Sequence, residues 1–77
     1  MSNLKERSTV SYYHNLAFDT RDNKSLDIRV TVDERTGKAE TQFVVRRMRS
    51  GRELGAFANF LDARLHYRRV FTHRGAA

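Results

Sequence analysis

The chain has 77 residues, no cysteine, 39% hydrophobic residues and a formal net charge of +6. A chain of this length forms one domain with a small core, and the lack of cysteine excludes disulfide bonds and thiolate metal sites. No apolar run approaches the ~20 residues of a membrane span and the first residues do not resemble a signal peptide, so we expect a small cytoplasmic globular protein without membrane contact.

The positive charge is concentrated in the second part of the sequence. Residues 1–45 carry seven basic and seven acidic side chains, whereas residues 46–77 carry eight arginines and only two acids. The planar guanidinium of arginine suits paired contacts with phosphate or carboxylate groups.

Alternating apolar residues predict three strands, at residues 9–18, 25–33 and 39–48. Both connections are short, and the second contains Gly37, so neighbouring strands should be antiparallel. One face of the first strand should carry Val10, Tyr12, His14, Leu16 and Phe18. The inner face of the sheet should also carry Leu26, Ile28, Val30, Val32, Phe43 and Val45.

Residues 50–69 fit one amphipathic helix, with Ser50 and Glu53 spaced as a capping box at its start. The stripe expected to face the sheet consists of Leu54, Phe57, Ala58, Leu61 and Leu65. A second apolar stripe, on the back of the helix, consists of Ala56, Phe60, Ala63 and Tyr67. A surface helix normally has only one such stripe, so the second needs an explanation.

These elements predict an α+β domain in which a three-stranded antiparallel sheet (β-β-β-α) packs against one C-terminal amphipathic helix. The domain should span residues 9–70, with a flexible N-terminal arm at residues 1–8 and a C-terminal tail at residues 71–77. Its thin core predicts low stability, which favours a dimer.

The sequence carries no motif for catalysis or metal binding: it has no HExxH, no cysteine–histidine set and no glycine-rich phosphate loop. Three carboxylates could be neighbours on the outer sheet face, but they alternate with Arg29 and Arg46, which favours cross-strand charge pairs over acid–base chemistry. These carboxylates are Asp27, Asp33 and Glu40. We therefore expect a binding protein with no enzyme activity, cofactor, metal or small-molecule substrate.

Nucleic acid, or a nucleoprotein complex, is the first expected partner. Four arginines cluster where the third strand should enter the helix, and two of them, Arg49 and Arg52, oppose the dipole at the expected helix start, so an anion such as phosphate would suit that position. Three more arginines extend the positive charge along the helix. The full expected site is Arg46, Arg47, Arg49, Arg52, Arg64, Arg68 and Arg69.

Over residues 9–69 the predicted topology looks like that of the DNA-binding modules of some phage-type integrases and of plant AP2 factors. The resemblance lies in topology without a shared sequence motif, and it implies that the outer sheet face would enter the major groove. Residues on that face that suit nucleic acid are Tyr13, Asn15, Arg29, Gln42 and Arg46. Because the three outer-face acids would repel phosphate, we favour contact through the arginine edge.

The alternative class is a protein-interaction module that acts through the second helix stripe. Its aromatic residues bordered by arginines have the composition of an interface hot spot, which would suit a homodimer or a protein partner. Inhibitors encoded by mobile elements, such as those that occupy a CRISPR effector, are one class of small basic protein of this kind. Two other interpretations remain: the chain's own termini cover the stripe, or its aromatic residues are exposed without a function.

Overall fold

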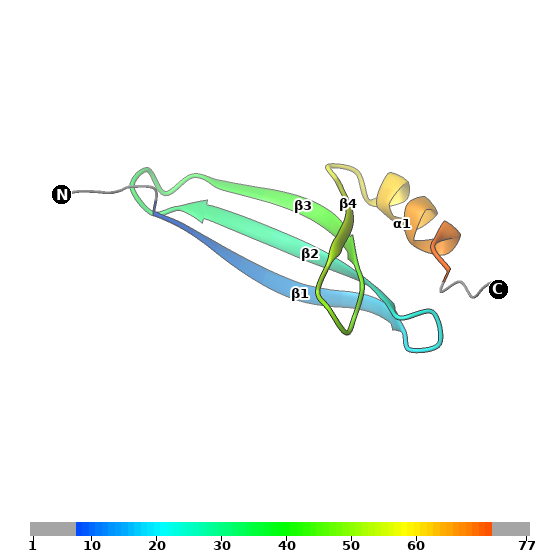
Figure 1. Cartoon of the computed structure of the whole chain (residues 1–77). Helices are drawn as coiled ribbons and strands as arrows, with labels where there is room; N and C mark the ends of the chain where they lie inside the picture. Colours follow the sequence, from blue (N-terminus) through cyan, green and yellow to red (C-terminus); the bar gives the residue numbers. More distant parts are fainter. Residues whose placement is uncertain (1–7, 72–77) are drawn as a thin grey trace.

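The computed structural model describes residues 8–71, which form four strands followed by one helix (Figure 1). The strands are β1 (Thr9–Asp19), β2 (Lys24–Asp33), β3 (Ala39–Arg46) and β4 (Glu53–Phe57), and the helix is α1 (Phe60–Arg69). The sheet is antiparallel in the order β1-β2-β3-β4, so each strand pairs with its neighbour in sequence. The α+β class with an antiparallel sheet and one C-terminal helix is therefore confirmed, with four strands instead of three.

The predicted helix over residues 50–69 is wrong in its first half, because residues 53–57 form β4. Gly51 has φ +75°, a left-handed conformation that no helix continues through, and its N–H donates to the carbonyl of Arg47 at 2.9 Å. The chain therefore reverses direction here and pairs with β3, with Phe57 opposite Phe43. This pairing gives residues 43–46 of β3 a second neighbour, which provides backbone partners on that side.

Ser50 and Glu53 consequently form no capping box. The Ser50 hydroxyl accepts a hydrogen bond from the Arg52 N–H at 3.1 Å within the β3–β4 loop, and Glu53 pairs with Arg29 across the sheet. The helix begins nine residues later, where Oδ1 of Asn59 accepts from the N–H groups of Leu61 and Asp62.

The helix faces are also the reverse of the prediction. Ala63 is fully buried, at 0% exposed, whereas Leu61 and Leu65 are 68% and 50% exposed. The apparent two-stripe pattern arose because part of it came from a strand, whose side chains alternate with a period of two and not 3.6. No helix within residues 8–71 has the length and apolar character needed to cross a membrane.

A β-bulge in β1 changes which of its side chains face the helix. Pairing with β2 shifts between Asn15 and Ala17, so Ala17 lies opposite Leu26 and Phe18 lies opposite Ser25. Leu16 is the extra residue, and the alternation predicted through residue 18 breaks at this point. Phe18 therefore lies on the outer face of the sheet, away from the helix.

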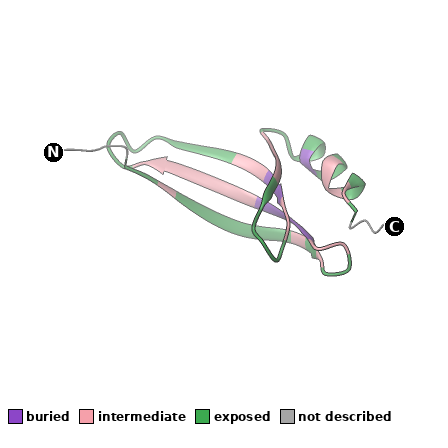
Figure 2. Ribbon diagram, in the orientation of Figure 1, coloured by how far each residue is buried: buried purple, intermediate pink, exposed green. Residues whose placement is uncertain are grey.

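The core is small and lies at one end of a long sheet, as Figure 2 shows in purple. Leu26, Val45 and Ala63 form it, and side chains packed against it include Leu54, Phe57 and Tyr67. We call this the helix end, and the opposite end, at the β2–β3 connection, the loop end. The described part of the chain measures 51 × 26 × 15 Å, so towards the loop end the sheet extends as a single layer.

Gly55 in β4 allows the helix to lie close to the sheet. A Cβ at this position would lie 2.9 Å from Cε1 of Phe57 and 3.3 Å from Cδ2 of His66 on α1. The Phe57 and His66 rings pack with their centroids 5.3 Å apart, and this contact joins β4 to α1.

Most of the predicted N-terminal arm and C-terminal tail, residues 1–7 and 72–77, lies outside the described residues.

The helix orientation gives a direct test by mutation. We expect Ala63→Glu to lower the free energy of unfolding by more than about 2 kcal/mol, because it buries a charge without a partner. The matched change Leu61→Glu, on the exposed face of the same helix, should change it by no more than about 0.5 kcal/mol. Urea denaturation of both variants measures the difference, and a larger loss for Leu61→Glu would contradict the observed packing.

Candidate functional site

The buried ammonium of Lys24 connects the sheet to the end of the helix. Lys24 is 5% exposed, and its Nζ donates to the carbonyl oxygens of Tyr67 at 2.7 Å and Val70 at 3.0 Å. It also lies 4.5 Å from the centre of the Tyr67 ring and 3.8 Å from a carboxylate oxygen of Asp22. Burial, with the charges of Asp19 and Asp22, raises the pKa of the Tyr67 phenol. Lys24 thus satisfies carbonyls at the negative end of the helix dipole.

Arg47 joins three segments at the same end of the molecule. Its guanidinium donates to the carbonyls of Asp22 at 2.8 Å and Asn23 at 3.4 Å in the β1–β2 turn, and to Phe71 at 3.2 Å after the helix. The Arg49 N–H adds a hydrogen bond to Oδ1 of Asn23 at 3.0 Å. The β3–β4 loop, the β1–β2 turn and the chain after α1 therefore meet at the helix end.

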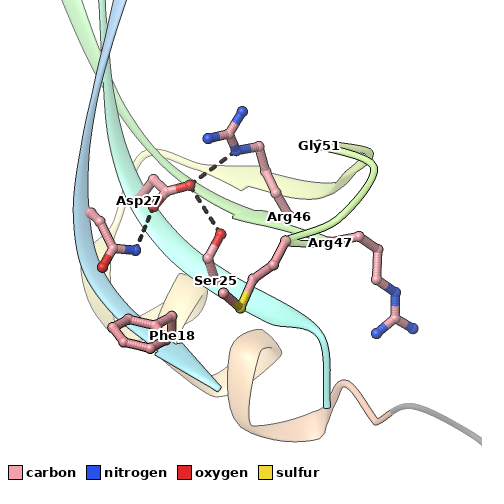
Figure 3. A pocket seen from close by; sticks show the side chains of 8 residues that line it. Phe18, Ser25, Asp27, Arg46, Arg47 and Gly51 are labelled. Atoms are coloured by element: carbon pink, nitrogen blue, oxygen red, sulfur yellow. Dashed lines mark hydrogen bonds and ion pairs between the residues drawn. The ribbon is translucent and has the colours of Figure 1, made fainter. Parts of the chain in front are cut away.

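The outer face of the sheet holds a buried carboxylate beside a shallow cavity of about 310 Å³ (Figure 3). Asp27 accepts hydrogen bonds from Asn15 at 2.8 Å, Ser25 at 3.1 Å and Arg46 Nε at 2.9 Å. The two oxygens of this carboxylate thus accept hydrogen bonds from three side chains, which satisfies a buried charged group. The cavity wall includes Asn15, Phe18, Ser25, Asp27, Arg46, Arg47, Met48 and Gly51.

Further along the outer face, Arg29 is held by neighbouring strands. Its guanidinium donates to Glu53 at 2.8 Å and to Gln42 at 2.6 Å. Hydrogen bonds with the Tyr13 side chain and with the Glu53 carboxylate raise the pKa of Arg29. Cross-strand charge pairing is therefore confirmed for Asp27 with Arg46, while the acid partner of Arg29 is Glu53 in β4, a segment predicted as helix.

The seven predicted arginines do not form one cluster. Arg46 pairs with Asp27, and its guanidinium lies 4.2 Å from the centre of the Tyr13 ring. The Arg47 side chain points away from Asp27, as Figure 3 shows, and donates instead to the β1–β2 turn and to Phe71. The other five side chains are exposed and have no ion pair with a carboxylate within residues 8–71. They are Arg49 and Arg52 in the β3–β4 loop and Arg64, Arg68 and Arg69 on α1.

The helix-dipole argument for Arg49 and Arg52 does not hold, because α1 begins at Phe60 and these two arginines lie in a loop. The acidic residue in the first helical turn is Asp62, and the basic residues in the last turn are His66, Arg68 and Arg69. Both placements are favourable to the dipole. An anion site at the start of the helix is therefore not supported.

The predicted interface residues do not share one open face. Ala56 lies in β4 opposite Val44, and Ala63 is in the core. Phe60 packs edge-on against Phe43 with ring centroids 5.6 Å apart, and Tyr67 packs against the core beside Lys24. The sheet covers Ala63 and partly covers Ala56 and Tyr67, while Phe60 remains 41% exposed, an arrangement that none of the sequence-based alternatives proposes.

Sequence reasoning missed two residues on which the helix depends. Asn59 carried a usable signal, since asparagine is among the strongest N-cap residues and is followed by a run with helical periodicity. Lys24 carried none, because a lysine in a polar turn looks solvated until the helix C-terminus is placed against it.

No protein-family model matches the sequence, and comparisons with curated proteins and with solved structures likewise find no match for this chain.

The Asp27–Arg46 pair should contribute more to stability than the other outer-face pair. We expect Asp27→Asn to cost about 1–3 kcal/mol of unfolding free energy, because it weakens a carboxylate site that is almost fully buried. The same acid-to-amide change at Glu53, which is 44% exposed, should cost less than about 1 kcal/mol. Equal losses in thermal or urea unfolding would contradict a structural role for the Asp27 cluster.

Proposed function

We propose that this protein is a non-catalytic module that binds the phosphate backbone of a nucleic acid through five arginines: Arg49, Arg52, Arg64, Arg68 and Arg69. The observation that carries the proposal is that these side chains are exposed and lack an acidic partner within residues 8–71, while Arg29 and Arg46 are neutralised by carboxylates. The lack of cysteine supports a reducing compartment such as the cytoplasm.

The five arginines are carried by elements that meet at the helix end. Arg47 ties the β3–β4 loop, which carries Arg49 and Arg52, to the chain that follows α1. Arg64 and Arg68 are four residues apart on α1 and therefore lie on one side of it. A positive surface formed by a loop and one side of a helix suits contact with phosphates but not recognition of base edges. Binding should therefore depend little on the nucleotide sequence.

We expect the chain to bind a short fluorescent DNA duplex with an affinity that falls steeply between about 50 and 200 mM salt, because each phosphate contact releases bound cations. Replacing Arg64 and Arg68 together with glutamine should weaken binding and reduce the slope of log affinity against log salt by about 1 for each lost contact. Fluorescence anisotropy on the duplex, on its single strand and on an RNA of the same sequence measures both quantities.

Arg35→Gln with Lys38→Gln is the matched control, since both are exposed basic residues at the loop end of the molecule. This pair removes the same two charges far from the five arginines and should leave affinity and slope nearly unchanged. An equal loss for the Arg35 and Lys38 pair would mean that only net charge matters, and salt-insensitive binding or none on all three probes would contradict the proposal. Arg47 is not a useful test position because its loss would disturb the fold.

A second candidate function is a protein-binding module, with an inhibitor of a larger complex as one form. It is favoured by the exposed leucines Leu61 and Leu65, which lie one turn apart on the solvent face of α1. Two large apolar side chains side by side on a short helix match a helix-in-groove contact. This surface replaces the predicted interface on the other side of the helix.

For this second function, we expect Leu61→Glu with Leu65→Glu to keep the fold but abolish capture of a specific protein from nuclease-treated lysate. The pair Leu61→Met and Leu65→Met keeps the apolar surface and should retain the captured protein. Capture that survives the glutamate pair would contradict a role for this face, and circular dichroism confirms that each variant remains folded.

A further inference from the structure

The strand β1 forms an open edge of the sheet. It pairs with β2 on one side, and within residues 8–71 no strand lies on its other side. An edge strand presents unpaired N–H and C=O groups that can pair with a further strand. Natural proteins usually protect such an edge with charges, proline or a bulge.

The direction of the unpaired backbone groups follows from the register. The Glu34 N–H donates to the Ser8 carbonyl at 2.8 Å, and this continues the register in which Thr9 lies opposite Asp33. In an antiparallel pair, residues that bond to the neighbouring strand alternate with residues whose N–H and C=O point away from it. The outward-pointing residues up to the bulge are therefore Thr9, Ser11, Tyr13 and Asn15.

The edge also lacks protecting charges along its length. Residues 9–18 contain no lysine, arginine, aspartate or glutamate, in a chain of which 31% is charged. Its one protecting feature is the bulge at Leu16, which ends the regular edge at Asn15. Tyr12, in the middle of the open part, is 60% exposed.

We propose that a second copy of the chain pairs with this edge, β1 against β1, across a two-fold axis at Tyr12. The four outward-pointing residues are symmetric about Tyr12, so this register pairs each of them with a residue of the partner. Ser11 then lies opposite Tyr13 of the other copy, and Tyr12 lies opposite itself. The result is one continuous eight-stranded antiparallel sheet, which is a closed dimer.

Charge favours a second copy as the occupant. A two-fold axis brings each strand against itself, so any charged residue near the axis would face its own like charge. Residues 9–18 of β1 have no such residue, and Asp19 lies at the end of the strand beyond the bulge. Residues 28–43, which surround the axis at the loop end, carry three basic and three acidic side chains, so the chain's excess of positive charge lies away from the contact. Nucleic acid would not select this neutral edge.

Side chains add to the backbone pairing. Directly opposed residues that do not share backbone hydrogen bonds bring their side chains closest, so the two Tyr12 rings would pack together on the helix-facing side of the sheet. Near the loop end, where no helix covers the sheet, β1 would gain a neighbouring strand on its free edge. Additional paired strands stabilise an extended sheet.

Sedimentation equilibrium over a wide range of protein concentration tests the dimer. We expect a mass of twice the 9.0 kDa chain at high concentration. Ser11→Pro should shift the mass to a single chain, because it removes an outward N–H while leaving the β1–β2 hydrogen bonds intact. Ser11→Ala is the matched control, since it loses the same hydroxyl but keeps the N–H, and it should remain a dimer.

Tyr12→Lys provides an independent disruption, because it places two positive charges opposite each other at an exposed position, and Tyr12→Phe should remain a dimer. If circular dichroism shows that Ser11→Pro does not fold, the masses of the Tyr12→Lys and Tyr12→Phe variants test the dimer instead. A single-chain mass for the unaltered protein at every concentration would overturn the proposal. A dimer that survives the folded disrupting variants would also overturn it, since another surface would then be responsible. Neither outcome bears on nucleic-acid binding.

Discussion

The contact between Lys24 and the carbonyls at the end of α1 holds the two layers of this protein together. A ten-residue helix is too short to be stable in water by itself, and Ala63 is the only residue of α1 that is fully buried. A buried ammonium that satisfies two backbone carbonyls and packs against Tyr67 therefore supplies the attachment that a larger apolar face would otherwise give. Arg47, in the β3–β4 loop, likewise donates to backbone carbonyls, those of Asp22 in the β1–β2 turn and Phe71 after the helix.

The strands could be predicted because alternation is local, and the register follows when one face is apolar. The first half of the predicted helix could not be separated from a strand on the same basis, since ELGAF also fits a helical stripe of apolar residues. Gly51 was the discriminating residue, because a glycine at a reversal ends a helix but allows a hairpin. With residues 53–57 in β4, the side of α1 that faces the sheet is the side that carries Ala63.

The candidate site shows the same division between local and tertiary information. The concentration of arginine was visible in the sequence, but which arginines remain available depends on partners that are distant in the chain. Arg46 is neutralised by Asp27 and Arg47 donates to backbone carbonyls, whereas Arg49, Arg52 and the helix arginines have no acidic partner within residues 8–71. The β1 bulge is a further case, because one extra residue reverses every side chain beyond it and no composition signal marks it.

The separation of charge along the molecule has a consequence for how it approaches a partner. The described part is 51 Å long, which is several Debye lengths at physiological salt. The five exposed arginines that lack an acidic partner within residues 8–71 lie toward the helix end, whereas the basic and acidic residues of the loop end are equal in number. Such a particle has a large electric dipole moment, and a polyanion exerts a torque on it before contact. The helix end would then arrive first, which shortens the rotational search that precedes a productive encounter.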